Sequence, residues 1–220
     1  MIWPTICIDD FFTNPKEIVE YARTLKYKPS EHGAWPGERS EPLHKLDNDF
    51  FNHLTTKMVA ALYPNEWRDI GWSADSYFQR TGSKWKGPGW VHKDVHNQFS
   101  SIVYLDGDTD CGTSLYKENT HETVPLINKI KNSCNLNPSK MKNIEYKKAL
   151  ERHNKKFTKT ISFNSEINRC LMFDSYQYHA VDDFNKSNSS ERITIITFFK
   201  SIFRPDGKPL NPHAGESCRI

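Results

Sequence analysis

The feature that most constrains the fold is a change of hydrophobic period near Trp72. From there to residue 199, short segments rich in β-branched and aromatic residues alternate with turn signals such as Asp106-Gly107-Asp108. This alternation is typical of β-strands joined by tight turns. The predicted strands are residues 74–80, 99–105, 113–116, 158–163, 169–173 and 192–199. A run of short strands of this kind favours a β-sandwich or a jelly roll.

Helical periodicity is confined mainly to the N-terminal third of the chain. Asn14-Pro15 is a typical helix start, and Tyr63-Pro64 is a typical helix end. The predicted elements are a strand over residues 2–12, a helix over 16–25, a loop over 30–43 and a helix from 47 or 48 to 62. We therefore expect a mainly β chain (α+β) with its N-terminal helices packed on one face of a sheet.

The length of 220 residues predicts a single domain with a sizeable core. Residues 1–70 supply a strand and supporting helices, and residues 72–200 supply the β-rich core. The basic segment 128–160 interrupts this core with ten Lys and Arg residues against two Glu. We interpret it as an inserted helix that forms a lid or a solvated outer face; a guide for an anionic substrate is the alternative.

Composition excludes several classes of protein. The mean hydropathy is −0.74, and the apolar runs are too short to span a bilayer. The N-terminus has no basic region of the kind that begins a signal peptide. Five scattered cysteines without a CxxC pair predict reduced thiols in a cytoplasmic protein. A net charge of +3 is too small on its own to indicate nucleic-acid binding.

Two distant segments carry a metal-ligand pattern. His92 and Asp94 are two residues apart, so on a strand or at its end their side chains point the same way. His179 follows a short apolar strand and offers a second imidazole. Two histidines and one carboxylate form the facial triad of non-haem Fe(II) oxygenases. His96 is a competing ligand, because it is also two residues from Asp94. The remaining polar-flanked histidines are predicted to be surface residues: His121, His153 and His213.

Arg192 follows His179 by thirteen residues and shares a predicted strand face with Thr194. An arginine that points into a barrel is costly unless it is paired. A bound dicarboxylate would pair with it through two hydrogen bonds. The alternatives are an internal partner, Asp174 or Asp182, or a register that turns Arg192 outward. Tyr104 is a second candidate contact for the same carboxylate, or a core residue.

These motifs together resemble the Fe(II)/2-oxoglutarate-dependent dioxygenases, in particular the prolyl-4-hydroxylase-like branch. The resemblance rests on His92-Lys93-Asp94, residues 101–106, Gly112-Thr113-Ser114-Leu115-Tyr116, residues 171–174 with His179, and Arg192-Ile193-Thr194. It implies a double-stranded β-helix, which is a distorted jelly roll. It implies iron bound by His92, Asp94 and His179, and 2-oxoglutarate bound by Arg192 with Tyr104 and Thr194. Cys111-Gly112 stands where the family usually has Gly-Gly, and many prolyl-hydroxylase relatives have Lys at the position of Arg192.

The resemblance also implies a reaction, in which dioxygen and 2-oxoglutarate hydroxylate a substrate with release of succinate and CO2. Asp94 at the carboxylate position favours hydroxylation over halogenation. The substrate is open: peptidyl proline, an amino acid, a small metabolite or a nucleobase. Candidate substrate residues lie in the loops 35–40 and 80–90 and beside the metal ligands; they are Arg39, Trp85, Trp90 and His96. Trp85 and Trp90 are equally compatible with packing of their loop.

Three alternatives remain at this point. One is a non-catalytic β-barrel with a structural metal. Another is a cupin-like metal enzyme that uses no oxo acid. The third is a nucleic-acid modifier of the same superfamily, for which the basic segment and the Trp-Lys loop are the motivation.

Overall fold

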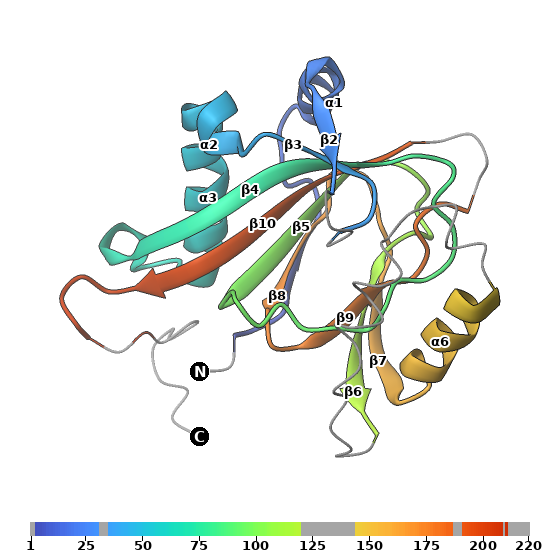
Figure 1. The fold of residues 1–220 in the computed structure, drawn as a ribbon. Helices are drawn as coiled ribbons and strands as arrows, with labels where there is room; N and C mark the ends of the chain where they lie inside the picture. Colours follow the sequence, from blue (N-terminus) through green and yellow to red (C-terminus); the bar gives the residue numbers. More distant parts are fainter. Residues whose placement is uncertain (1–2, 31–34, 120–143, 187–190, 209, 211–220) are drawn as a thin grey trace.

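The computed structural model describes residues 3–30, 35–119, 144–186, 191–208 and 210. Two antiparallel sheets make up most of this part of the chain (Figure 1). The larger sheet has the strand order β1-β8-β5-β10-β4-β3-β2, and the smaller has the order β7-β6-β9. The strands of the larger sheet are β1 (Ile6–Ile8), β2 (Tyr27–Pro29), β3 (Glu38–Ser40), β4 (Gly71–Thr81), β5 (Phe99–Asp106), β8 (Cys170–Asp174) and β10 (Arg192–Phe203). Those of the smaller sheet are β6 (Thr113–Glu118), β7 (Phe157–Phe163) and β9 (Tyr178–Val181).

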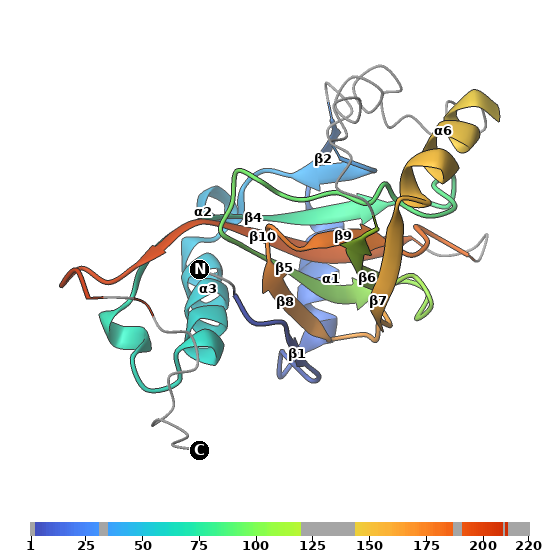
Figure 2. The same ribbon diagram turned by 90° about the horizontal axis from the view of Figure 1, so that it is seen from below.

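Helices cover one face of the larger sheet (Figures 1 and 2). Asp47 caps α3 by accepting a hydrogen bond from the Phe50 amide, at the helix start that was predicted at residue 47 or 48. Apolar side chains of α1 and α3 pack with Phe78, Phe99 and Phe199 of the sheet into the largest core cluster. The helices are α1 (Pro15–Thr24), α2 (Leu43–Leu46), α3 (Asn48–Leu62) and a 3-10 turn (Trp67–Asp69).

The smaller sheet lies against the opposite face of the larger one (Figure 2). Leu115 of β6 packs there with Tyr104, Leu171 and Phe173 of the larger sheet. Successive side chains of a strand point to opposite faces, so alternate residues of β5 pack against the helices on one side and against the smaller sheet on the other. A helix, α6 (Ile144–Asn154), flanks the smaller sheet. The strands of the smaller sheet overlap those of the larger sheet in the view of Figure 2, and residues of both sheets line the candidate site.

All six predicted core strands are present, and four N-terminal or connecting details differ from the prediction. The first strand is confined to Ile6–Ile8, because Asp10 has a positive φ of 52° and ends the extended backbone. The predicted loop over residues 30–43 contains β3, which pairs with β4. β9 was not predicted. His153 is buried and not on the surface, because its Nε2 hydrogen-bonds the Val91 carbonyl at 2.7 Å.

The basic segment is only partly described. Residues 120–143 lie outside the described residues, as do His121 and His213. The remainder forms α6 and the start of β7. Its basic side chains are mostly exposed, with Tyr146 and Leu150 buried on the inner side of the helix.

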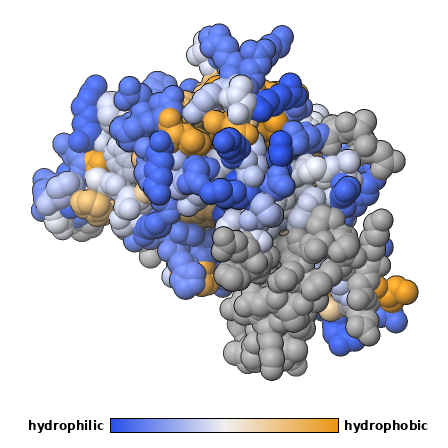
Figure 3. Space-filling view, turned by 45° about the horizontal axis from the view of Figure 1, so that its top comes forward, coloured by the Kyte–Doolittle hydropathy of each residue, from blue (hydrophilic) through white to orange (hydrophobic). Residues whose placement is uncertain are grey.

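Hydrophilic residues predominate on the face drawn in Figure 3, where hydrophobic residues form only small patches. Within the described residues, every helix falls short of the length and apolar character that a bilayer crossing requires. Cys7, Cys111 and Cys170 are free thiols.

Candidate active site

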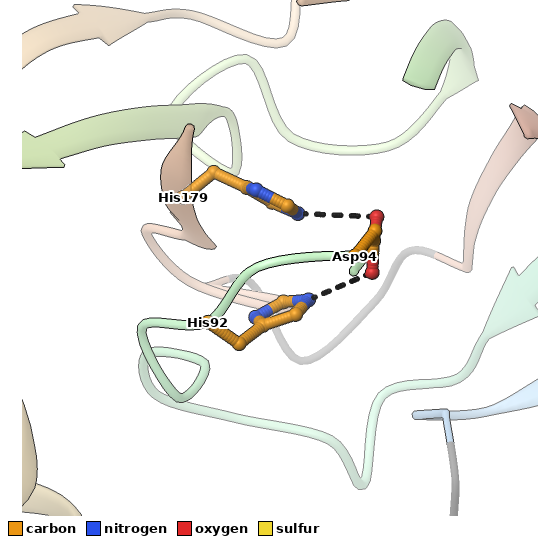
Figure 4. A group of neighbouring side chains, drawn as sticks. All are labelled: His92, Asp94 and His179. Carbon is orange, nitrogen blue, oxygen red and sulfur yellow. Dashed lines mark ion pairs between the residues drawn. The ribbon is translucent and has the colours of Figure 1, made fainter. Parts of the chain in front are cut away.

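His92, Asp94 and His179 converge on one point (Figure 4). One ligand atom from each side chain lies within 4.8 Å of the other two. Nε2 of His92 is 3.7 Å from Oδ1 of Asp94, and Nε2 of His179 is 3.5 Å from Oδ2. His92 and Asp94 come from the loop between β4 and β5, and His179 comes from β9. The structure thus assembles the three residues that the sequence pattern selected.

Backbone hydrogen bonds hold these segments together independently of the side chains. The amide of His92 donates to the carbonyl of His179 at 3.0 Å, and the amide of His179 donates to the carbonyl of His92 at 2.9 Å. This reciprocal pair is an antiparallel bridge that extends the smaller sheet by one residue beyond β9. The amide of Asp94 donates to the carbonyl of Ser175 at 2.8 Å. All three candidate ligands are therefore fixed by main-chain contacts.

Each imidazole is oriented by a carbonyl two residues before it. Nδ1 of His92 is 2.8 Å from the Trp90 oxygen, and Nδ1 of His179 is 2.9 Å from the Gln177 oxygen. A carbonyl accepts only, so each Nδ1 carries a hydrogen, which leaves Nε2 as the ring atom that can offer a lone pair to a cation in the cluster. This second hydrogen bond is the usual arrangement for a metal-binding histidine. Two lone pairs and a carboxylate then face one point, where a cation is the fitting occupant.

Interactions within the cluster favour the ionised form of Asp94. Burial raises the pKa of its carboxyl group, but a hydrogen bond from His179, the positive charges that His179 and His92 carry when protonated, and the Ser100 hydroxyl together lower that pKa below its ordinary value. The Ser100 Oγ donates to Oδ2 of Asp94 at 3.2 Å and lies 2.7 Å from the Ser175 Oγ. A carboxylate together with the Nε2 atoms of two imidazoles matches the donor set of a divalent iron site.

The cluster opens into a cavity of about 180 Å³ between the two sheets. One water needs only about 10–15 Å³ of such volume, so the cavity has room for small organic molecules. Its polar lining includes the three ligands, and its apolar lining comes mainly from both sheets and the segment before His92. The lining residues used below are Trp35, Arg39, Gln79, Trp90, Thr113, Phe184, Arg192, Ile196 and Phe198.

Arg192 lies on this cavity with its charge uncompensated. The residue is 4% exposed, and its Nε and Nη2 atoms have no hydrogen-bond partner. No ion pair found among the described residues involves it, and the alternative internal partners are engaged elsewhere: Asp174 accepts from backbone amides, and Asp182 accepts from Ser114. Burial lowers the pKa of the Arg192 guanidinium. A bound carboxylate would satisfy these buried donors.

Tyr104 and Thr194, the other two candidate 2-oxoglutarate residues, lie near Arg192. The Arg192 guanidinium is 5.5 Å from the centre of the Tyr104 ring. Thr194 is paired with Tyr104 across β10 and β5. The Tyr104 hydroxyl donates to Thr113 Oγ1 at 2.7 Å, and burial raises the pKa of Tyr104 to about 12. The phenol is therefore neutral at physiological pH and is oriented by Thr113.

The candidate substrate residues divide into two groups. Arg39 and Trp90 line the cavity. Trp85 and His96 do not: Trp85 packs against Phe184 with ring centroids 5.8 Å apart, and His96 is exposed outside the metal-ligand cluster. For Trp85, loop packing is the observed arrangement.

Several residues of the site were not selected from the sequence. Ser100 contacts Asp94, and Gln79 accepts a hydrogen bond from Arg39 Nε at 2.9 Å. Both line the cavity, but other polar residues occur in the same two strands, so no feature of the sequence distinguishes them. Trp35 was assigned only to a loop, because its contact with Arg39 depends on strand pairing that the sequence does not display.

No protein-family model matches this chain, and no curated protein matches its sequence. Solved structures do match. EvdO2 from Micromonospora carbonacea var. aurantiaca, complexed with 2-oxoglutarate, is 9% identical with a TM-score of 0.58, covering 96% of this chain and 90% of EvdO2. HygX from Streptomyces hygroscopicus, with nickel, 2-oxoglutarate and hygromycin B bound, is 11% identical with a TM-score of 0.54, covering 89% and 82%.

The α-ketoglutarate-dependent epimerase SnoN of nogalamycin biosynthesis is 13% identical with a TM-score of 0.51, covering 97% of this chain and 86% of SnoN. A Pseudomonas putida prolyl-4-hydroxylase also matches, at 8% identity with a TM-score of 0.49. At these identities the comparisons establish the fold. The chain has the fold of iron- and 2-oxoglutarate-dependent oxygenases, and its His-Asp-His cluster is consistent with those cofactors.

Proposed function

We propose that this protein is an oxygenase that uses Fe(II), 2-oxoglutarate and dioxygen to oxidise a small molecule. The observation that carries the proposal is that one cavity contains both a His-Asp-His cluster and a buried arginine without an acceptor. A purely structural metal site does not require an unpaired buried cation, whose desolvation is costly. An oxo-acid cosubstrate accounts for both features at once.

The proposed roles follow from the donors of each residue. His92 and His179 bind the metal through Nε2, and Asp94 binds it through its carboxylate. Arg192 binds the remote carboxylate of 2-oxoglutarate. Tyr104 and Thr194 border that carboxylate. Iron held by these three side chains would supply the activation of the oxo acid and dioxygen.

We propose hydroxylation, with succinate and CO2 as co-products, as the reaction. Asp94 supports it, because the carboxylate occupies the ligand position that a halide would need. We also propose that residues 1–220 form a single domain with a double-stranded β-helix as its core. The reciprocal His92–His179 bridge supports the latter, since it adds one more strand position to the smaller sheet. The free thiols are consistent with a cytoplasmic location.

The test is an anaerobic titration of the Fe(II)-loaded protein with 2-oxoglutarate. We expect a weak visible charge-transfer band when the oxo acid chelates the iron. The Arg192→Gln variant should lose most of this band, and Arg68→Gln, which changes an exposed arginine, should retain it. Calorimetry of 2-oxoglutarate binding to the nickel-loaded protein gives a second readout that does not require turnover.

Iron binding without any response to 2-oxoglutarate would contradict the proposal. That result would favour a cupin-like enzyme or a structural metal site. Equal 2-oxoglutarate affinity in the wild type and Arg192→Gln would contradict the role of Arg192 alone.

A further inference from the structure

A second arginine lines the cavity, on a different strand from Arg192. Arg39 lies on β3, and its guanidinium is 4.4 Å from the centre of the Trp35 ring and 5.4 Å from that of Phe198. Together with Gln79, these residues form what we call the Arg39 subsite (Trp35, Arg39, Gln79 and Phe198), all of which line the cavity. None of them has a role in the metal or cosubstrate site proposed above.

Strand register separates this subsite from Arg192. Arg39 pairs with Gln79, Gln79 pairs with Thr194, and Thr194 pairs with Tyr104. The four residues form one row across β3, β4, β10 and β5, and paired residues point to the same face of a sheet. Neighbouring strands are about 4.8 Å apart, so Arg39 lies about 10 Å across the sheet from β10. One small dicarboxylate bound at Arg192 therefore leaves Arg39 available to another molecule.

The Arg39 subsite presents hydrogen-bond donors without matching acceptors. The Nε of Arg39 donates to Gln79 Oε1, and this is its only hydrogen bond within the described chain. Both terminal nitrogens of the guanidinium therefore remain available. The buried Nε1 of Trp35 also has no partner. Apart from the bond between Arg39 Nε and Gln79, these donors have no acceptor among the described residues.

The charge of the cavity matches this pattern. Burial lowers the pKa of Arg39 to about 10, so the side chain stays cationic at neutral pH. Asp94 is the only carboxylate among the cavity-lining residues of the described chain, and it belongs to the metal-ligand cluster. The aromatic rings beside Arg39 hold the guanidinium in place but do not neutralise it.

We propose that the Arg39 subsite binds a carboxylate of the substrate, with the two terminal nitrogens of Arg39 forming a bidentate pair. The inference rests on the proposed function for the identity of the ligand as substrate. A carboxylate carries one negative charge, which one guanidinium neutralises, whereas a phosphate monoester carries about −1.5 to −2. The apolar side chains of Ile196, Phe184 and Trp90 would then contact the body of a small carboxylic acid.

The experiment measures binding of matched fragments to nickel-loaded protein saturated with 2-oxoglutarate. Each pair in the panel consists of a carboxylic acid and its primary amide, from acetate and acetamide to phenylacetate and phenylacetamide. Phenyl phosphate is included to test the alternative anion. Ligand-observed NMR gives the dissociation constants. We expect at least one acid to bind about tenfold or more tightly than its amide, because the amide lacks the charge.

Variants assign that preference to Arg39. Arg39→Gln should abolish the preference of acid over amide, and Arg39→Lys should retain part of it, because lysine keeps the charge but not the bidentate geometry. The matched control is Arg68→Gln, since Arg68 also lies over a tryptophan ring, at 4.6 Å from Trp67, but is exposed. A structural role for Arg39 would change stability without changing the ratio of acid to amide affinity.

Three results would overturn the inference: no acid that binds better than its amide, an acid preference that survives in Arg39→Gln, or tighter binding of phenyl phosphate than of phenylacetate. The same experiment shows separately whether 2-oxoglutarate binds. If 2-oxoglutarate does not bind, the proposed function is refuted. The ratio of acid to amide affinity, compared between the wild type and Arg39→Gln without 2-oxoglutarate, would still decide whether Arg39 binds anions.

Discussion

Ser100 contacts the metal-ligand cluster through a single hydroxyl. Its Oγ donates to Asp94 and also lies within hydrogen-bonding distance of the Ser175 Oγ. Loss of a hydrogen bond to a ligating carboxylate typically lowers metal affinity by about 10–100-fold. We expect Ser100→Ala to weaken Fe(II) or Ni(II) binding by about tenfold, measured by competition with a chelator.

Ser101→Ala is the matched control for this prediction. The Ser101 hydroxyl contacts the sulfur of Met58 on the helical side of the sheet, at 3.2 Å. Its removal should leave the metal affinity unchanged. If both variants bind metal like the wild type, Ser100 has no role in positioning Asp94.

Replacement of the single residue Arg192 should affect the stability of the protein. Without a carboxylate ligand its buried charge is uncompensated, and replacing a buried charge with an apolar residue of similar size is often neutral or stabilising by about 1–4 kcal/mol. Arg192→Met should therefore unfold at an equal or higher urea concentration than the wild type when 2-oxoglutarate is absent. A clear loss of stability in Arg192→Met would mean that the guanidinium has a partner in the free protein.

Individual ligands of the site were predictable from the sequence, whereas their supporting partners were not. The spacing of His92 and Asp94 is a weak signal by itself in a chain with nine histidines. It indicates a metal site in combination with His179, which follows an apolar strand, and with Arg192 thirteen residues later. Ser100 and Gln79 are common residue types whose roles depend on register. Trp85 illustrates the reverse: a tryptophan beside lysines resembles a substrate contact, but it is used to pack against Phe184.

Helix α6 supports the segment that precedes His92. The Asn154 side chain donates to the Gly89 carbonyl at 2.9 Å and accepts from the Val91 amide at 3.1 Å. His153 and Tyr146 of the same helix contact this segment through Val91 and Trp90. The helix thus fixes the backbone that carries the first metal ligand.

We expect Asn154→Ala to cost about 1–3 kcal/mol of unfolding free energy, because it leaves buried backbone groups without partners. Metal affinity should fall as well, since His92 follows directly. Lys155→Ala, at an exposed neighbouring position, is the control for both measurements. Unaltered metal affinity in a destabilised Asn154→Ala would show that α6 contributes to folding but not to the site.

Gly112 determines how closely β6 and β7 approach each other. A Cβ at this position would lie 1.7 Å from the backbone oxygen of Phe163, so a side chain requires the strands to separate. We expect Gly112→Ala to lower the unfolding free energy by about 2–4 kcal/mol in urea denaturation. Gly82→Ala is the control: its Cβ would meet no atom within 4 Å, and little change is expected.

Helices and strands marked by their own sequence were predicted, whereas short strands that depend on pairing with a neighbouring strand were not. The proline near the start of α1 and the aspartate cap of α3 mark helices within a few residues. β3 has only three residues, in a stretch rich in turn formers, and exists because it pairs with β4. β9 is similarly short, and its existence depends on β6 alongside it.

At the scale of the whole molecule, cofactor binding should raise the stability of the fold. A ligand that binds only the folded state at 100 times its dissociation constant adds about 2.7 kcal/mol. For a chain of this size, each kcal/mol shifts the melting temperature by about 2–4 °C. We expect nickel with 2-oxoglutarate to raise the melting temperature by about 5–10 °C, and the metal alone by less. In Arg192→Met, the metal should still raise the melting temperature, and 2-oxoglutarate should add no further increase.

The reciprocal hydrogen bonds between His92 and His179 join main-chain atoms, so they use none of the side-chain atoms that would bind an ion. Zinc fingers, in contrast, are unfolded without their metal. On the proposed function, we expect folding to precede metal binding in this protein. A cell short of iron would then accumulate folded, inactive protein that regains activity once the metal returns, without new synthesis.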